Sequence, residues 1–171
     1  MPESLVRFEG RAWKFGDHVD TDAIIPARHC NTADPARLAE HCMEDADPAF
    51  AGRVAPGDIV VAGINFGCGS SREVAPIALK ACGVAGVVAA SFARIFFRNA
   101  INLGLPIFEC PAAAAAIADG DTVAIEPASG LIHDLTTGAT FRAAPFPDFL
   151  LEIVASGGLH GYVQARLAGR P

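Results

Sequence analysis

The sequence predicts an α/β fold with a mixed sheet, in a single domain that covers residues 1–171. Three observations support this fold class. Short, apolar strands alternate with helical segments in the middle of the chain, as they do in strand–helix–strand units. Hairpin patterns with turn residues flank that region. No linker or internal repeat divides the chain, and its 171 residues, 51% of them hydrophobic, suffice for one core.

The first third of the chain is expected to begin with a strand. Apolar and charged side chains alternate from residue 6, which predicts a strand over residues 6–15. Residues 21–26 are a short apolar piece. Asp34 followed by Pro35 predicts a helix that begins there and continues to about residue 44. Residues 45–56 are polar, contain prolines and are expected to form a connection.

The central and C-terminal parts supply the remaining elements. Residues 58–63, 84–90 and 106–109 are apolar runs that predict buried strands. Helices are expected from about Arg72 to residue 83, over 92–103 with Ser91 as the N-terminal cap, and over 111–118. Residues 121–126, 131–135 and 140–143 predict hairpin strands, and residues 148–155 and 162–167 predict two final helices.

Charge and hydropathy exclude several classes of partner. Thirteen Lys and Arg oppose 19 Asp and Glu, for a net charge of −6, and the basic residues are scattered. Nucleic acid and anionic membranes are therefore not expected as partners. Arg, Gly or Pro interrupts every apolar stretch well before the length of a membrane span.

Five cysteines occur, at positions 30, 42, 68, 82 and 110. Their number is odd, they show no C-x-x-C spacing, and the N-terminus lacks the apolar core of a signal peptide. These features predict free thiols in a reducing, cytoplasmic protein. The cysteine spacing suits no iron–sulfur cluster, and the pairs His29-Cys30 and His41-Cys42 match no standard zinc spacing, so no metal site is expected in this chain.

The segment with the clearest chemical pattern is residues 63–76, GINFGCGSSREVAP. Gly67 and Gly69 can adopt a positive φ and direct successive amides toward a bound oxyanion. Arg72, at the entrance of the following helix, can bind a carboxylate through two parallel hydrogen bonds. The alternative is a tight turn with a serine cap. The segment is neither a P-loop, which requires a Lys, nor a G-x-S-x-G elbow.

Several motifs in order point to a family. NFGCGSSRE, SFARIFFRNAINLGLP, GDHVDTDAIIPAR and the late DLTTGATF resemble the C-terminal swivel domain of aconitases and the small subunits of isopropylmalate isomerases. The resemblance runs from about residue 10 to residue 167. It implies a swivelling β/β/α domain that closes over an active site built largely by a separate large subunit.

The resemblance also implies roles for particular residues. The large subunit would carry a [4Fe-4S] cluster whose open iron acts on the substrate hydroxyl, and this chain would bind no cofactor. The catalytic serine of the family falls on Ser70 and its carboxylate clamp on Ser71 and Arg72, while the active-site aspartate falls on Asp22. Cys68 is expected to be a small buried residue of the same loop.

Other residues leave alternatives open. Arg28 would lie in the loop that faces the variable arm of the substrate, or it is a solvated loop arginine. Arg94 and Arg98 lie four apart on one helical face, a spacing more typical of structural arginines than of substrate ligands. Val74 stands where the related sequences usually have His, which leaves the identity of the substrate open.

The resemblance implies two classes of function. The first is a hydro-lyase subunit that isomerises 2-isopropylmalate and 3-isopropylmalate through a dehydrated intermediate in leucine biosynthesis, active only with its large subunit. A sister dehydratase acting on homoaconitate, 2,3-dimethylmalate or (R)-2-methylmalate is the alternative within that class. The second is a non-catalytic module of the same fold that holds an anion.

Overall fold

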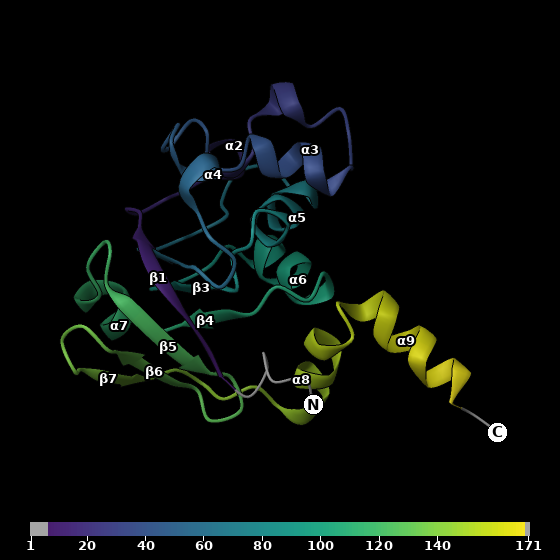
Figure 1. The fold of residues 1–171 in the computed structure, drawn as a ribbon. Helices are drawn as coiled ribbons and strands as arrows, with labels where there is room; N and C mark the ends of the chain where they lie inside the picture. Colours follow the sequence, from purple (N-terminus) through teal and green to yellow (C-terminus); the bar gives the residue numbers. More distant parts are fainter. Residues whose placement is uncertain (1–6, 170–171) are drawn as a thin grey trace.

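The computed structural model describes residues 7–169 and shows a curled mixed sheet with helices packed around it (Figure 1). The strands are β1 (Phe8–Lys14), β2 (Ile59–Ala62), β3 (Gly86–Ala89), β4 (Ile107–Glu109), β5 (Thr122–Glu126), β6 (Leu131–Asp134) and β7 (Thr140–Arg142). The helical elements are α2 (Thr21–Ile24), η1 (Ala27–His29), α3 (Pro35–Glu40), α4 (Phe50–Arg53), α5 (Val74–Ala81), α6 (Arg94–Asn102), α7 (Pro111–Ala116), α8 (Asp148–Ala155) and α9 (Leu159–Ala168).

The sheet has two halves that share β1. Its strand order is β4-β3-β2-β1-β5-β6-β7. From β1 to β4 all neighbours are parallel, and from β1 through β5 to β7 all neighbours are antiparallel. The first part of β1 pairs with β5 and its last part pairs with β2. The predicted α/β class with a mixed sheet is therefore confirmed.

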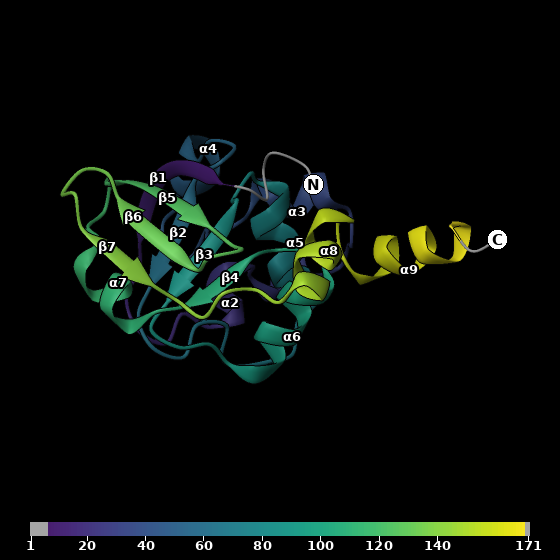
Figure 2. The same cartoon turned by 90° about the horizontal axis from the view of Figure 1, so that it is seen from below.

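Side chains alternate between two cores on opposite faces of the parallel strands. All four residues of β2 are buried, as expected where both faces of a strand are covered. Val60 and Val87 pack with α3, α5 and α6 on one face, whereas Val61 and Val88 pack with α7 and Phe108 on the other. Figure 2, seen from below, shows α7 apart from the α5 and α6 pair. This two-sided packing fixes the end of β2, where the glycine-rich loop begins.

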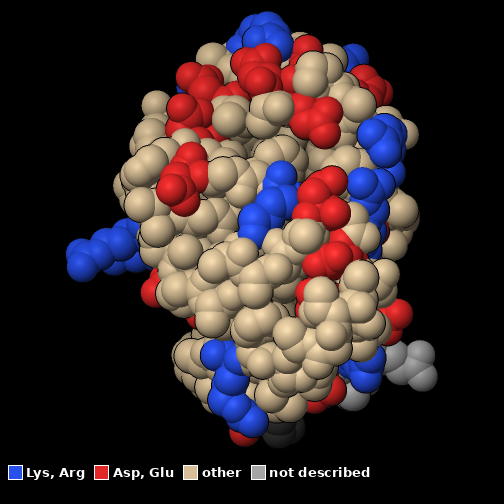
Figure 3. Space-filling view, turned by 90° about the vertical axis from the view of Figure 1, so that its left-hand side faces the viewer, with Lys and Arg blue, Asp and Glu red and all other residues tan. Residues whose placement is uncertain are grey.

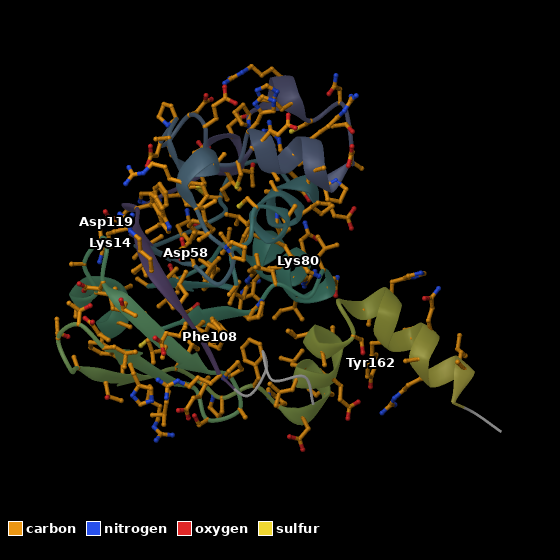
Figure 4. The ribbon with its side chains drawn as sticks, in the orientation of Figure 1. Lys14, Asp58, Lys80, Phe108, Asp119 and Tyr162 are labelled. Carbon is orange, nitrogen blue, oxygen red and sulfur yellow. The ribbon has the colours of Figure 1, made fainter. Side chains whose placement is uncertain are left out.

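One buried carboxylate joins β1 to the start of β2. Asp58 is only 6% exposed, and it accepts hydrogen bonds from Trp13 Nε1 (2.9 Å), Ala55 N (2.9 Å) and Arg11 N (3.1 Å). Figure 4 labels Asp58 close to β1. Because buried polar groups need partners, this set of bonds specifies how β1 meets β2.

Several predicted element boundaries change. The first strand begins at Phe8, and Val6 lies outside the described residues. The helix expected over 34–44 ends at Glu40 and is followed by turns. The connection expected over 45–56 contains α4, because Phe50 inserts against Trp13 and Phe15 at ring distances of 5.1 and 5.8 Å.

The predicted cap at Ser91 is wrong. Ala93 precedes the first residue of α6 and supplies no side-chain cap. The Ser91 hydroxyl instead accepts a hydrogen bond from the Asn65 amide at 2.8 Å. A serine hydroxyl can accept a hydrogen bond from a neighbouring loop as well as from a helix N-terminus, and here the donor is the loop amide.

The last helix leaves the body of the molecule, whereas α8 buries Leu151 and Ile153. Helix α9 projects away from the sheet in both ribbon views (Figures 1 and 2), and its side chains are all at least partly exposed. Among residues 7–169 no helix is both long enough and apolar enough to span a membrane.

Candidate functional site

The candidate site is built on the loop that joins β2 to α5. Gly67 and Gly69 have φ of +80° and +89°, as predicted for a loop that bends sharply. A Cβ at Gly67 would overlap the ring of Phe96, which is buried under the loop. Only glycine therefore lets the backbone approach the aromatic ring this closely.

Two neighbouring segments hold this loop from opposite sides. On one side, Gly67 N donates to Val19 O at 2.7 Å and Thr21 N donates to Cys68 O at 2.9 Å. On the other side, Phe66 N donates to Ser91 O at 3.0 Å and Ala93 N to Phe66 O at 2.9 Å. The start of the loop is thus bonded on both sides, like a strand in a sheet. Its two neighbours are the segment around residues 19–21 and the segment around residues 91–93, which belong to the motifs GDHVDTDAIIPAR and SFARIFFRNAINLGLP.

Past these anchors the loop amides are free. None of the four consecutive amides of residues 68–71 donates a hydrogen bond to an acceptor within residues 7–169. They lie just before the N-terminus of α5, where the helix dipole favours negative charge. Unpaired amides in such a loop form a site for an oxyanion.

A pocket of about 200 Å³ opens beside these amides. The side chains of Ser70 and Ser71 at its wall are exposed, and that of Arg72 is half-buried. The wall from α6 includes Arg94 and Asn99. The structure therefore brings together three of the five predicted site residues in one hollow.

Asp22 is linked to this pocket by its hydrogen bond with Arg72. The Nη1 atom of Arg72 donates to Asp22 Oδ1 at 2.5 Å and to Ile25 O at 3.1 Å. The hydrogen bond from Arg72 lowers the pKa of the Asp22 carboxyl and raises the pKa of the guanidinium. In the part of the chain that the structure describes, Nε and Nη2 of Arg72 have no acceptor, which leaves one edge of the guanidinium for a carboxylate.

Thr21 is a residue of the site that the sequence reasoning missed. Its side chain is buried, and its Oγ1 donates to the carbonyl of Ser70 at 2.9 Å. This bond fixes the peptide that follows the candidate catalytic serine. The position of Thr21 next to Asp22, in the motif GDHVDTDAIIPAR, was the available signal.

Arg94 and Arg98 lie on one face of α6, as expected from their four-residue spacing, and both line a hollow with Phe92 and Phe97. Of the two, Arg94 also lines the pocket with Ser70. Asn99 joins Arg94 in the pocket.

Arg28 lies away from this pocket. Its guanidinium binds Asp45 at 2.8 Å and Glu44 at 3.1 Å, and half of its side chain is exposed. These two carboxylates raise the pKa of Arg28. In this chain alone Arg28 therefore belongs to a surface ion-pair network and not to the wall formed by Ser70, Ser71 and Arg72.

All five cysteines are free thiols, as predicted. Cys68 is half-buried, not buried as expected, and Cys42 and Cys110 are the buried ones. A hydrogen bond with Cys82, together with burial, raises the pKa of Cys42. No three cysteine sulfurs converge in residues 7–169, so the donor atoms of this chain do not fit an iron–sulfur cluster.

The face of the molecule drawn in Figure 3 carries mixed charge. On the face drawn in Figure 3, Lys and Arg lie among Asp and Glu over the upper part, and a broad uncharged area lies below. This face offers no continuous basic stripe of the kind that follows a nucleic-acid backbone.

Comparison with known proteins agrees with the fold and the loop. Residues 11–111 match the family model of the aconitase C-terminal domain. The fold and the site therefore define a swivel-type domain of the aconitase class.

Individual relatives show which members of the aconitase class this chain is most similar to. A 3-isopropylmalate dehydratase small subunit from Moorella thermoacetica is 64% identical over 93% of this chain and 96% of its own length. Its counterpart from Heliobacterium modesticaldum is 59% identical over 95% and 98%. A crystal structure of 3-isopropylmalate dehydratase from Methanocaldococcus jannaschii superposes with a TM-score of 0.89 at 48% identity, covering 95% of this chain and 96% of that one. The chain belongs to the aconitase C-terminal domain family and, within it, groups with the 3-isopropylmalate dehydratase small subunits.

Proposed function

We propose that this chain is the small subunit of a hydro-lyase that interconverts 2-isopropylmalate and 3-isopropylmalate by dehydration and rehydration, in leucine biosynthesis. One observation carries the proposal. Ser70, Ser71 and Arg72 line one pocket beside four unpaired amides, and Asp22 orients the arginine. The full-length similarity to dehydratase small subunits supports the same reaction class.

The chemistry explains why such a loop is needed. Elimination removes a proton from a carbon beside a carboxylate, and that carbon is a weak acid. Ser70 is the proposed base; a serine can take a proton from carbon only as its alkoxide, and that form becomes accessible only where amides and positive charge stabilise it. The free amides of residues 68–71 and the guanidinium of Arg72 supply both.

The remaining site residues bind and orient the substrate. The free edge of Arg72 can bind a substrate carboxylate with two parallel hydrogen bonds, and the Ser71 hydroxyl adds a third. Asp22 holds the guanidinium in place, and Thr21 holds the peptide after Ser70. Such preorganisation lowers the cost of ordering the site when the substrate arrives.

A large subunit is the proposed partner, and it is proposed to carry the [4Fe-4S] cluster that this chain cannot hold. Three large apolar side chains near the loop support a protein contact there. Ile64, Ile95 and Phe97 are each more than a third exposed. Apolar side chains gathered around a small site commonly mark a surface that a partner covers.

The proposed substrate class is a small hydroxy-dicarboxylate. A sister dehydratase of homoaconitate, 2,3-dimethylmalate or (R)-2-methylmalate is the alternative. The two features that keep this alternative open are Val74, half-buried in the first turn of α5, and the segment 28–35. Arg28 is proposed to contact the variable arm of the substrate. It would have to leave Glu44 or Asp45 to do so, and closure on the large subunit is the step at which this could occur.

The setting of the protein is also proposed. Five free thiols support a reducing, cytoplasmic location, and the net charge of −6 supports an enzyme without nucleic-acid or membrane partners. One domain over residues 1–171 is proposed, because a single sheet takes strands from Phe8 to Arg142.

The decisive experiment is anaerobic co-expression with a candidate large subunit from the same organism. Absorbance of the unsaturated intermediate would be followed with 2-isopropylmalate, homocitrate, 2,3-dimethylmalate and 2-methylmalate in parallel. Turnover of 2-isopropylmalate that disappears when either chain is omitted supports the proposal. Turnover of another acid alone selects the sister dehydratase.

The same experiment tests the anion-binding module. A complex with a loaded cluster that turns over none of the four acids would overturn the assigned substrates. Failure to bind any large subunit would favour the non-catalytic module of the same fold.

A further inference from the structure

Two histidines from separate segments lie stacked beside one glutamate, next to the end of α3. His29 is the last residue of η1, His41 follows the last residue of α3, and Glu44 lies in the turn after it. The two imidazole centroids are 3.5 Å apart and the rings are nearly parallel, at 4°. Neither histidine takes part in the site around Ser70.

Three potential ligand atoms converge there. His41 Nδ1 lies 2.7 Å from Glu44 Oε2, and His29 Nε2 lies 3.2 Å from the same oxygen. The ligand atoms of all three residues lie within 4.8 Å of one another. Zinc bonds of about 2.0–2.1 Å place tetrahedral ligand atoms about 3.3 Å apart, so the observed spacing is close to what one ion requires.

The ring nitrogen of His29 lacks a hydrogen-bond partner. Its Nε2 is inaccessible to solvent and within residues 7–169 it makes no hydrogen bond, although Glu44 Oε2 lies 3.2 Å away. A buried nitrogen without a partner is costly. A metal ion would satisfy it, provided that one of the parallel rings turns about χ2, which is a soft torsion in histidine.

Local charge also favours a cation. Glu44 and Asp45 carry two negative charges against the one positive charge of Arg28. Arg28 binds Oε1 of Glu44, which leaves Oε2 directed at the histidines. The Glu44 carboxylate therefore contacts Arg28 through one oxygen and the histidines through the other.

We propose that His29, His41 and Glu44 form a site for a divalent transition-metal ion of the Zn²⁺ type. Two imidazoles and one carboxylate suit zinc, with a fourth position open to water. The ion would tie η1 to the turn after α3 and so fix the segment that carries Arg28. This proposal departs from the expectation that the chain has no metal site, because residues 29, 41 and 44 match no standard zinc spacing and only the fold brings them together.

The test titrates Zn²⁺ into the full-length, chelator-treated chain against a chromophoric competitor. One equivalent should bind, and His29→Gln and His41→Gln should each weaken it by about tenfold or more. His133→Gln is the matched control, because His133 faces Glu126 at 3.5 Å without a third ligand in the described chain, and it should bind Zn²⁺ like the parent. Circular dichroism of each variant checks that the fold is kept.

A second measurement separates this site from the free thiols. Co²⁺ in place of Zn²⁺ should give d–d bands without sulfur-to-cobalt charge transfer, since no cysteine is among the ligands. The proposal is overturned by any of three results: no binding of either ion, binding unchanged in both histidine variants, or a charge-transfer band that Cys30→Ser removes.

Discussion

Arg72 donates to the carboxylate of Asp22 across 2.5 Å although the two residues are 50 positions apart in the sequence. The pair joins the first motif of the chain to the glycine-rich loop. Because the same guanidinium nitrogen also donates to Ile25 O, Nη1 is fixed, while Nε and Nη2 have no acceptor among residues 7–169. This relationship gives each residue a separable role that substitutions can test.

Replacing Arg72 by lysine should mainly weaken substrate binding. An ammonium is a point charge and cannot make two parallel hydrogen bonds, so we expect a loss of about 2 kcal/mol, or roughly 30-fold in KM. Steady-state kinetics of the reconstituted complex measures this, with Arg98→Lys as the control outside the pocket. An unchanged KM for Arg72→Lys would remove this residue from the carboxylate clamp.

Asp22 should titrate below its ordinary pKa of 3.8, because the hydrogen bond from Arg72 favours the carboxylate. Since the pKa is lower in the folded chain, the pair stabilises the fold at pH values above the ordinary pKa and loses this contribution as pH falls through the lowered pKa. NMR titration of the side-chain carboxyl should show the low pKa in the parent and an upward shift in Arg72→Gln. Arg98→Gln should leave it unchanged, and equal titration in all three proteins would contradict the coupling.

Ser70→Ala should abolish turnover and leave the complex with the large subunit intact. The substitution removes only the proposed base, while the loop amides and the Thr21 contact remain, because both involve backbone atoms of the loop. Activity and gel-filtration profiles of the reconstituted enzyme measure the two effects. Ser156→Ala, at the residue that follows α8 and outside the pocket, should retain full activity. Near-normal activity of Ser70→Ala would show that another group is the base.

Gly67→Ala should destabilise the fold more than Gly138→Ala does. Both glycines have φ of +80°, but a Cβ at Gly138 meets no neighbour, whereas one at Gly67 overlaps Phe96. We expect about 1 kcal/mol from the backbone conformation alone at Gly138, and about 1–3 kcal/mol more at Gly67 from overpacking. Denaturant unfolding of both variants measures the difference. Equal losses would mean that Phe96 moves aside without cost.

The sequence predicts most of the sheet, because apolar strands and turn residues leave local patterns. The loop was also predictable, since Gly67, Gly69 and Arg72 each have a known chemical use at the end of a strand. Short α4 was missed because the burial of Phe50 against Trp13, a tertiary contact, selects it. Ser91 was misassigned because its hydroxyl has two possible partners, and only the fold decides between them.

Contacts between distant residues could not be predicted from local pattern. The hydrogen bond from Thr21 to Ser70 and the stack of His29 on His41 depend on how loops cross in three dimensions. The ion pairs of Arg28 were also not predictable from local pattern, since its partners Glu44 and Asp45 are 16 and 17 positions away. Motif resemblance placed Asp22 in the site but gave no partner for it within this chain.

The shared strand β1 has a consequence for the order in which the molecule assembles during synthesis. The parallel half can pair once residue 109 has left the ribosome, but the first part of β1 must wait for Thr122–Glu126. Closing a pairing across more than 100 residues is slow. The first strand to be translated is therefore among the last to have both its edges covered, and until then a nascent chain presents an open strand edge to its neighbours on the same messenger.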